Sequence, residues 1–90
     1  MLYAVICSDK PDHLQTRLDT RDAHVAWLKE SPVVFAGPVL ADDEETMTGS
    51  LIVIEAESLA AARAWAEQDP YKAAGLFDRV DIRPWRRVMG

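Results

Sequence analysis

The chain has 90 residues, which leave room for one hydrophobic core, so we predict a single domain over residues 1–90. A domain of this size covers only about 60–65% of its unfolded surface, so a hydrophobic fraction of 49% predicts a further surface covered by a partner. The net charge of −5 argues against general nucleic-acid binding, and no apolar run reaches the roughly 18 residues that a membrane span needs.

The first part of the chain is predicted to form a strand and a helix. Residues 2–8 are strongly β-prone and end at a charged turn before Pro11. Residues 12–30 form the helix, with Asp12 as its N-cap and a possible break at Asp19-Thr20.

Two strands and a helix follow. A second strand spans residues 33–40 and is expected to be interrupted at Gly37-Pro38; after an acidic turn at 41–47, a third strand spans 48–56. The second helix has the sequence SLAAARAWAEQ and is capped by Ser58.

The last part of the chain is predicted to contain a turn and one more strand. Asp69-Pro70 ends the second helix, residues 71–75 form a further turn closed by Gly75, and residues 77–88 form the last strand.

The order β-α-β-β-α-β predicts an α+β, ferredoxin-like domain. Its antiparallel sheet has the strand order 4-1-3-2, with both helices on one face. The first and third strands are apolar at successive residues, as central strands are, whereas the fourth alternates like an edge strand. Because the helices cover only one face, we expect a homodimer with its sheets packed face to face; the alternative is a monomer with an exposed apolar patch.

The first helix carries the residues of greatest chemical interest. At about 100° per residue, its core stripe is predicted to be Leu14, Leu18 and Val25. Arg21 and His24 lie in a narrow arc beside that stripe, joined by Arg17 if the helix is unbroken. Charged groups at the rim of a core need a partner or an anionic ligand.

His24 and Asp69 are the candidate catalytic residues. A histidine acts as a general base or acid when a carboxylate orients its other ring nitrogen. Spacing alone does not join these two residues. From the residues alone, the favoured interpretation is that His24 is a satisfied core histidine and Asp69 a turn residue that ends the helix.

The remaining candidates have weaker patterns. Tyr71 can offer a phenolic hydrogen bond or simply pack, and Ser50 can donate a hydroxyl near the pocket. Cys7 is interpreted as a small buried hydrophobe, and the acidic turn as solvated rather than as a metal site. The single cysteine and the absence of a signal-peptide pattern predict a cytoplasmic protein with no metal.

Four short motifs follow one another in an informative order: Arg21-Asp22-Ala23-His24-Val25, Ala36-Gly37-Pro38, Thr48-Gly49-Ser50, and Asp69-Pro70-Tyr71 with Gly75. Together with the closing Arg83-Pro84-Trp85, they resemble the YciI-like (YCII-related) family over essentially the whole chain. The resemblance implies a dimeric α/β barrel with a His–Asp pair in a pocket, matching His24 and Asp69. The chemistry it implies is elimination of a halide from a substituted hydroquinone without metal or organic cofactor.

We therefore predict an enzyme that acts on a small anionic or aromatic molecule without a cofactor. Its catalytic residues are His24 and Asp69, and its substrate-binding residues are Arg17, Arg21, Pro38, Ser50 and Tyr71. The alternatives are a module that binds or senses a small metabolite in the same pocket and, more weakly, a stress or assembly protein, because one fold can host all three. The substrate itself is not specified by the sequence.

Overall fold

The computed structural model describes all residues from Met1 to Gly90 and places strands and helices in the predicted order. The elements are β1 (Leu2–Asp9), α1 (Leu14–Lys29), β2 (Val33–Leu40), β3 (Met47–Glu55), α2 (Leu59–Ala66), α3 (Pro70–Ala73) and β4 (Phe77–Trp85). Ser58 caps α2 as predicted, since its side chain accepts a hydrogen bond from the Ala61 amide.

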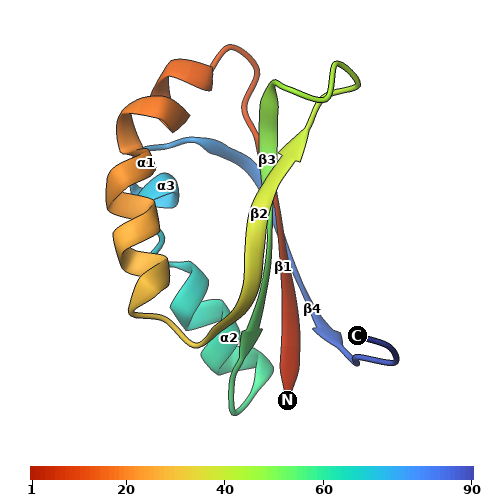
Figure 1. Cartoon of the computed structure of the whole chain (residues 1–90). Coiled ribbons are helices and arrows are strands. Elements are labelled where there is room, and N and C mark those ends of the chain that lie inside the picture. The colour runs from red at the N-terminus through yellow and green to blue at the C-terminus, as the bar shows by residue number, and fades with distance from the viewer.

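The strands form one antiparallel sheet in the order β2-β3-β1-β4 (Figure 1), which confirms the predicted α+β ferredoxin-like topology. β1 and β3 are central. The predicted interruption at Gly37-Pro38 is wrong: β2 is continuous there, and its register shifts lie near its two ends. An edge strand tolerates proline, because one row of its amides needs no neighbouring strand.

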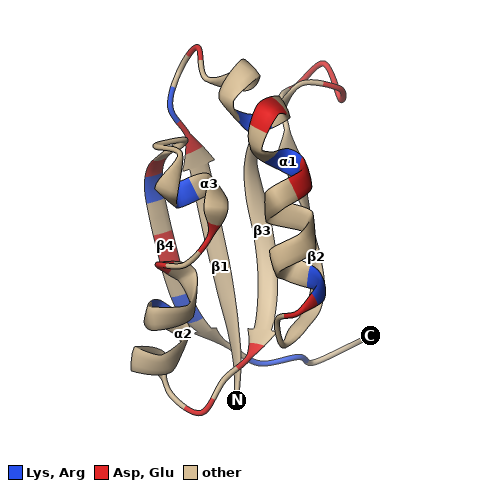
Figure 2. Ribbon diagram, turned by 90° about the vertical axis from the view of Figure 1, so that its left-hand side faces the viewer, with Lys and Arg blue, Asp and Glu red and all other residues tan.

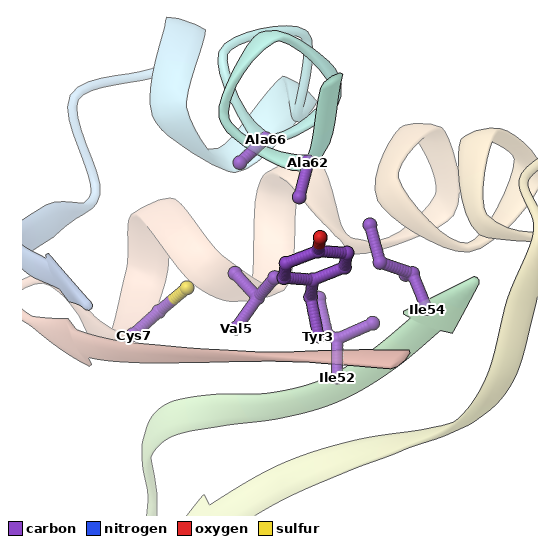
Figure 3. Close-up of a cluster of buried hydrophobic side chains, with 7 residues drawn as sticks. All are labelled: Tyr3, Val5, Cys7, Ile52, Ile54, Ala62 and Ala66. Atoms are coloured by element: carbon purple, nitrogen blue, oxygen red, sulfur yellow. The ribbon is translucent and has the colours of Figure 1, made fainter. Parts of the chain in front are cut away.

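All helices lie on one face of the sheet, with α1 in front of β2 and β3 and α2 in front of β1 and β4 (Figure 1, Figure 2). The buried core lies between the sheet and α2 (Figure 3), and its members come from alternate positions of β1 and β3 and one face of α2: Tyr3, Val5, Cys7, Ile52, Ile54, Ala62 and Ala66. The two alanines are four residues apart, so they share one helix face and allow α2 to approach the sheet closely.

α1 packs against the sheet through a stripe that includes buried polar residues, which corrects the predicted core stripe at Leu14 and Leu18 but not at Val25, which is half-buried. Leu14 and Leu18 are 41% and 48% exposed, whereas Arg17 and His24 are buried. The helix is not broken, so residues 17 and 24 lie two turns apart on the same side. Sequence periodicity does not tell which of two neighbouring stripes faces the sheet, and here the buried charges have partners that make their burial tolerable.

Two element boundaries also differ from the prediction. Asp12 does not cap α1; it adopts a left-handed conformation with φ 59° in the preceding turn, and His13 occupies the cap position without a side-chain bond. β4 ends at Trp85 instead of continuing to residue 88. Trp85 pairs with Leu2, the first residue of β1, so no neighbouring strand remains beyond that point.

The face of the sheet away from the helices is partly covered by the chain itself. Phe35 of β2 and Trp85 of β4 meet edge to face at 6.0 Å across the two central strands, and the Arg87 guanidinium lies over the Phe35 ring. Four apolar side chains stay exposed on this face: Ile6, Phe35, Val39 and Leu51. No helix of the chain has the length and apolar character to span a bilayer.

Candidate functional site

A cavity of about 210 Å³ opens between α1 and the β2–β3 side of the sheet. Its wall contains every predicted substrate-binding residue and His24: Arg17, Arg21, His24, Pro38, Ser50 and Tyr71. Apolar side chains, among them Val25, Leu28 and Ile52, complete the wall. Asp69 is not part of the wall; it lies behind His24.

Asp69 is positioned by the start of α3. Its backbone is extended, Pro70 follows at the first helical position, and its Oδ1 accepts a hydrogen bond of 2.9 Å from the Tyr71 amide. The same Oδ1 is 2.8 Å from His24 Nδ1. Both side chains are almost fully buried. The structure thus brings together two residues 45 positions apart, which spacing alone did not join.

This contact sets the orientation and tautomer of His24. A carboxylate only accepts hydrogen bonds, so Nδ1 carries the hydrogen and Nε2 is left with its lone pair whenever the ring is neutral. Nε2 has no hydrogen-bond partner in the protein. It is nevertheless accessible to solvent, because Trp65 Nε1 is the only buried side-chain polar atom that lacks a partner. His24 therefore offers a free proton acceptor at the cavity wall.

Arg17 is buried against the sheet by three hydrogen bonds. Its Nε donates to Asp9 Oδ2 at 2.6 Å, and its Nη2 donates both to Asp9 Oδ1 at 2.8 Å and to Ser50 Oγ at 3.0 Å. Burial works against the charged guanidinium, but the hydrogen bonds and negative charge of Asp9 outweigh it and raise the pKa of Arg17 above its usual value.

Tyr71 fills the space between Arg17 and His24. Its ring stacks on the His24 ring with centroids 3.9 Å apart and an angle of 18°, and the Arg17 guanidinium carbon lies 4.6 Å from its centroid. Burial raises the pKa of the Tyr71 phenol, although Arg17 and Arg21 act in the opposite direction. Tyr71 is therefore a neutral hydrogen-bond donor that also separates the Arg17 guanidinium from the His24 ring.

Arg21 differs from Arg17 in its surroundings. It lines the cavity and is exposed, and no acidic group forms an ion pair with it. Figure 2 shows the basic positions of α1 along the helical side of the molecule, close to acidic ones. Arg21 is thus an exposed positive charge in the cavity wall with no ion-pair partner in the chain.

Asp9 was not recognised from the sequence, where it marked only the end of a strand. A signal for it existed: Tyr3, Val5, Cys7 and Asp9 alternate along β1, so Asp9 belongs to the face that meets the helices.

The position of Ser50 depends on the neighbouring Gly49, because a Cβ at residue 49 would lie 2.2 Å from the Cys7 carbonyl oxygen. The glycine allows β1 and β3 to pair closely beneath the cavity.

The Cys7 thiol should make stability depend on alkaline pH. Burial, with a further contribution from Asp69, raises its pKa from 9.0 to about 12. Between these values only the unfolded chain loses the thiol proton, so the free energy of unfolding should fall by roughly 1 kcal/mol per pH unit as the pH rises from 9. Urea unfolding of the wild type and of Cys7→Ala between pH 8 and pH 10 measures this; parallel pH dependences would contradict it.

Comparison with known proteins gives relatives over nearly the whole chain. A family model described as the YCII-related domain matches residues 1–86. Protein YciI of Escherichia coli O6:H1 is 42% identical, with the alignment covering 98% of this chain and 99% of that protein. An uncharacterized protein of Haemophilus influenzae is 38% identical with the same coverage.

Among solved structures, this chain is similar to TftG, a 5-chloro-2-hydroxyhydroquinone dehydrochlorinase from Burkholderia phenoliruptrix AC1100. The two chains superpose with a TM-score of 0.87 at 35% sequence identity, covering 96% of this chain and 94% of the other. That structure is a complex with 2,5-dihydroxybenzoquinone.

Proposed function

This chain belongs to the YCII-related family, as its motifs predicted, and on that premise we propose that it is an enzyme that moves a proton on a small, cyclic, anionic substrate without a cofactor. His24 is the proposed general base and acid, and Asp69 holds its tautomer. Arg17, Arg21, Ser50 and Tyr71 are the proposed substrate-binding residues, with Pro38 shaping the wall beside them.

One observation carries this proposal: His24 Nδ1 is bound to a buried carboxylate while Nε2 is free at the cavity wall. In a general base, one ring nitrogen is held and the other faces the substrate. A histidine that served packing alone would have no need of an open nitrogen, because enclosed polar atoms are normally paired.

The reaction that best fits these groups is an elimination. His24 Nε2 takes a proton from the substrate, the electron pair left behind forms a new double bond, and an anion such as chloride leaves with the electrons of its own bond. The substrate thus loses one molecule of acid overall, and no oxidant or reductant is consumed. If the electron pair instead shifts along a conjugated ring and the proton returns elsewhere, the same residues perform an isomerisation.

The cavity supports a small anionic substrate. Its volume of about 210 Å³ lies below the range of drug-sized pockets, which begins at roughly 300 Å³. Apolar side chains and Tyr71 in the wall suit a flat ring, while Arg21 supplies a positive charge that forms no ion pair within the chain. A substituted hydroquinone, the class named for TftG, has this combination of ring and acidic hydroxyl groups.

Chloride release from 5-chloro-2-hydroxyhydroquinone tests the proposal. The assay is run without oxygen, so that spontaneous oxidation of the hydroquinone does not contribute, and compared with a protein-free control. Faster chloride release with the protein supports an elimination enzyme. Binding of 2,5-dihydroxybenzoquinone without any gain in chloride release would instead identify the alternative, a non-catalytic binding or sensing module.

We also propose that two copies pair through the faces of the sheet that lack helices. Ile6, Phe35, Val39 and Leu51 project from this face, and their exposure in a single chain is large for apolar side chains. Monomeric proteins seldom leave such a contiguous apolar surface in water. A two-fold dimer would cover the same patch on both copies.

Leu51→Lys should convert the dimer to a monomer. Leu51 lies on the central strand β3 and is 40% exposed on the proposed interface, so a lysine there would lose its water on pairing. Light scattering after size exclusion should give the mass of one 10.1 kDa chain, against twice that mass for the wild type. Ala60→Lys, exposed on α2, is the matched control and should stay dimeric. A wild-type monomer, or a dimeric Leu51→Lys, contradicts the proposed interface.

A further inference from the structure

Asp9 has no role in the proton transfer described above, yet it makes both carboxylate contacts to Arg17. Its Oδ2 and Oδ1 accept hydrogen bonds from Nε and Nη2 at 2.6 Å and 2.8 Å, and both side chains are almost fully buried. Two parallel bonds between a carboxylate and a guanidinium fix the plane of the guanidinium as well as its position. Ser50 Oγ, at 3.0 Å from Nη2, adds a third restraint.

These contacts leave one edge of the guanidinium available. The bonds to Asp9 and Ser50 use Nε and Nη2, and none of them uses Nη1; the Tyr71 phenol is the further polar neighbour of the guanidinium. Nη1 is also accessible to solvent, because Trp65 Nε1 is the only buried side-chain polar atom that lacks a partner. Arg17 lines the cavity. The Tyr71 ring lies under the guanidinium and limits its movement toward His24. Arg17 thus presents two N–H donors of Nη1 from an immobilised group.

We propose that Asp9 is a positioning residue, which holds Arg17 so that Nη1 donates to an anionic oxygen of the bound ligand. The inference rests on the proposed function of the cavity. It also assigns different roles to the two arginines: because Asp9 neutralises the charge of Arg17, Arg17 orients the ligand through a directed hydrogen bond. Arg21 has no acidic partner, so Arg21 contributes the net positive charge that attracts the anion.

Calorimetric titration with 2,5-dihydroxybenzoquinone tests this in the full chain. This probe is anionic at neutral pH because its hydroxyl groups are vinylogous carboxylic acids. Asp9→Asn removes the charge that orients Arg17, and Asp9→Glu keeps the charge but moves the carboxylate by one methylene, which protects folding. Each should weaken binding by about tenfold, the effect of losing one well-aligned bond to a charged group. Asp12→Asn, exposed and three residues away, should bind like the wild type.

An Arg17→Met background separates positioning from general stability. If Asp9 acts through Arg17, adding Asp9→Asn to Arg17→Met should not weaken binding further. The Arg17 Nε–H resonance of the ligand-free protein gives a second readout: it should exchange slowly in the wild type and rapidly in Asp9→Asn.

The outcomes separate this inference from the proposed function. Folded Asp9→Asn and Asp9→Glu proteins that bind the probe as tightly as the wild type would overturn the positioning role while the cavity kept its ligand. A further loss of affinity when Asp9→Asn is added to Arg17→Met would also overturn it. A wild-type protein that binds no anionic quinone would instead contradict the proposed function on which the inference rests.

Discussion

His24→Ala should lower kcat for chloride release by roughly 10²–10⁴-fold, the usual contribution of a positioned general base. The change removes the ring whose Nε2 is free at the cavity wall, but it leaves Arg17, Arg21 and Ser50 in place to bind the substrate. KM should therefore change much less than kcat. Initial rates of chloride release over a range of 5-chloro-2-hydroxyhydroquinone concentrations give both constants.

His13→Ala is the matched control for this loss. The chain has two histidines, and His13 lies before α1, where its ring contacts the Pro11 carbonyl instead of the cavity. Its replacement should leave kcat unchanged. If His24→Ala retains the wild-type kcat while folded, the ring is a packing residue and the proposed general base is wrong.

Asp69→Asn should reduce kcat for a different physical reason. Asparagine is also a good N-cap, so the start of α3 can persist. Asp69 Oδ1 meets both His24 Nδ1 and the Tyr71 amide, so the asparagine can place either its oxygen or its nitrogen there. With the oxygen there, the negative charge that stabilises the protonated ring is lost. With the nitrogen there, the amide donates to Nδ1, and the ring hydrogen moves to Nε2, which removes the lone pair from the cavity. Because the two residues act as a unit, the double variant should be no slower than His24→Ala alone. A double variant that is markedly slower would show that they act independently.

The arrangement of the sheet could be predicted from the sequence because each strand carries its own signal. Successive apolar residues mark β1 and β3 as central, and the alternation of charged and apolar residues marks β4 as an edge. The ends of elements were less predictable. β4 ends at Trp85 because its partner there, Leu2, is the first residue of β1. The sequence of residues 86–88 does not contain this information.

The site could be predicted only in part, for a related reason. Helical spacing placed Arg17, Arg21 and His24 in one arc, and they do meet one cavity. It also suggested that Leu14 and Leu18 form the core, because burying an apolar stripe costs less than burying a charged one. That reasoning fails here since the compensating acids, Asp9 and Asp69, come from β1 and from the start of α3, beyond the reach of local periodicity. The family motifs paired His24 with Asp69, whereas the alternation along β1 indicated only the face on which Asp9 lies and not its pairing with Arg17.

Arg17→Met should lower the free energy of unfolding by about 3–5 kcal/mol, because it leaves the Asp9 carboxylate buried without its partner. A loss of that size is large against the roughly 5–15 kcal/mol that stabilises a typical domain. Urea unfolding followed by circular dichroism gives the value at 25 °C. A loss below about 1 kcal/mol would mean that Asp9 reaches water easily, which would also weaken its role in holding Arg17.

Removing both charges should be far less harmful than removing one. In Asp9→Leu with Arg17→Met, no buried charge is left unpaired, and replacing such an ion pair by apolar side chains is often neutral. Recovery should stop about 1–3 kcal/mol short of the wild type, because Ser50 Oγ loses the bond that it accepts from Arg17. Adding Ser50→Ala removes the hydroxyl that has lost its hydrogen-bond donor, and should restore the rest of the free energy of unfolding. Stability would then be restored in a protein unable to orient an anion, which is the result expected if the buried pair serves the ligand and not the fold.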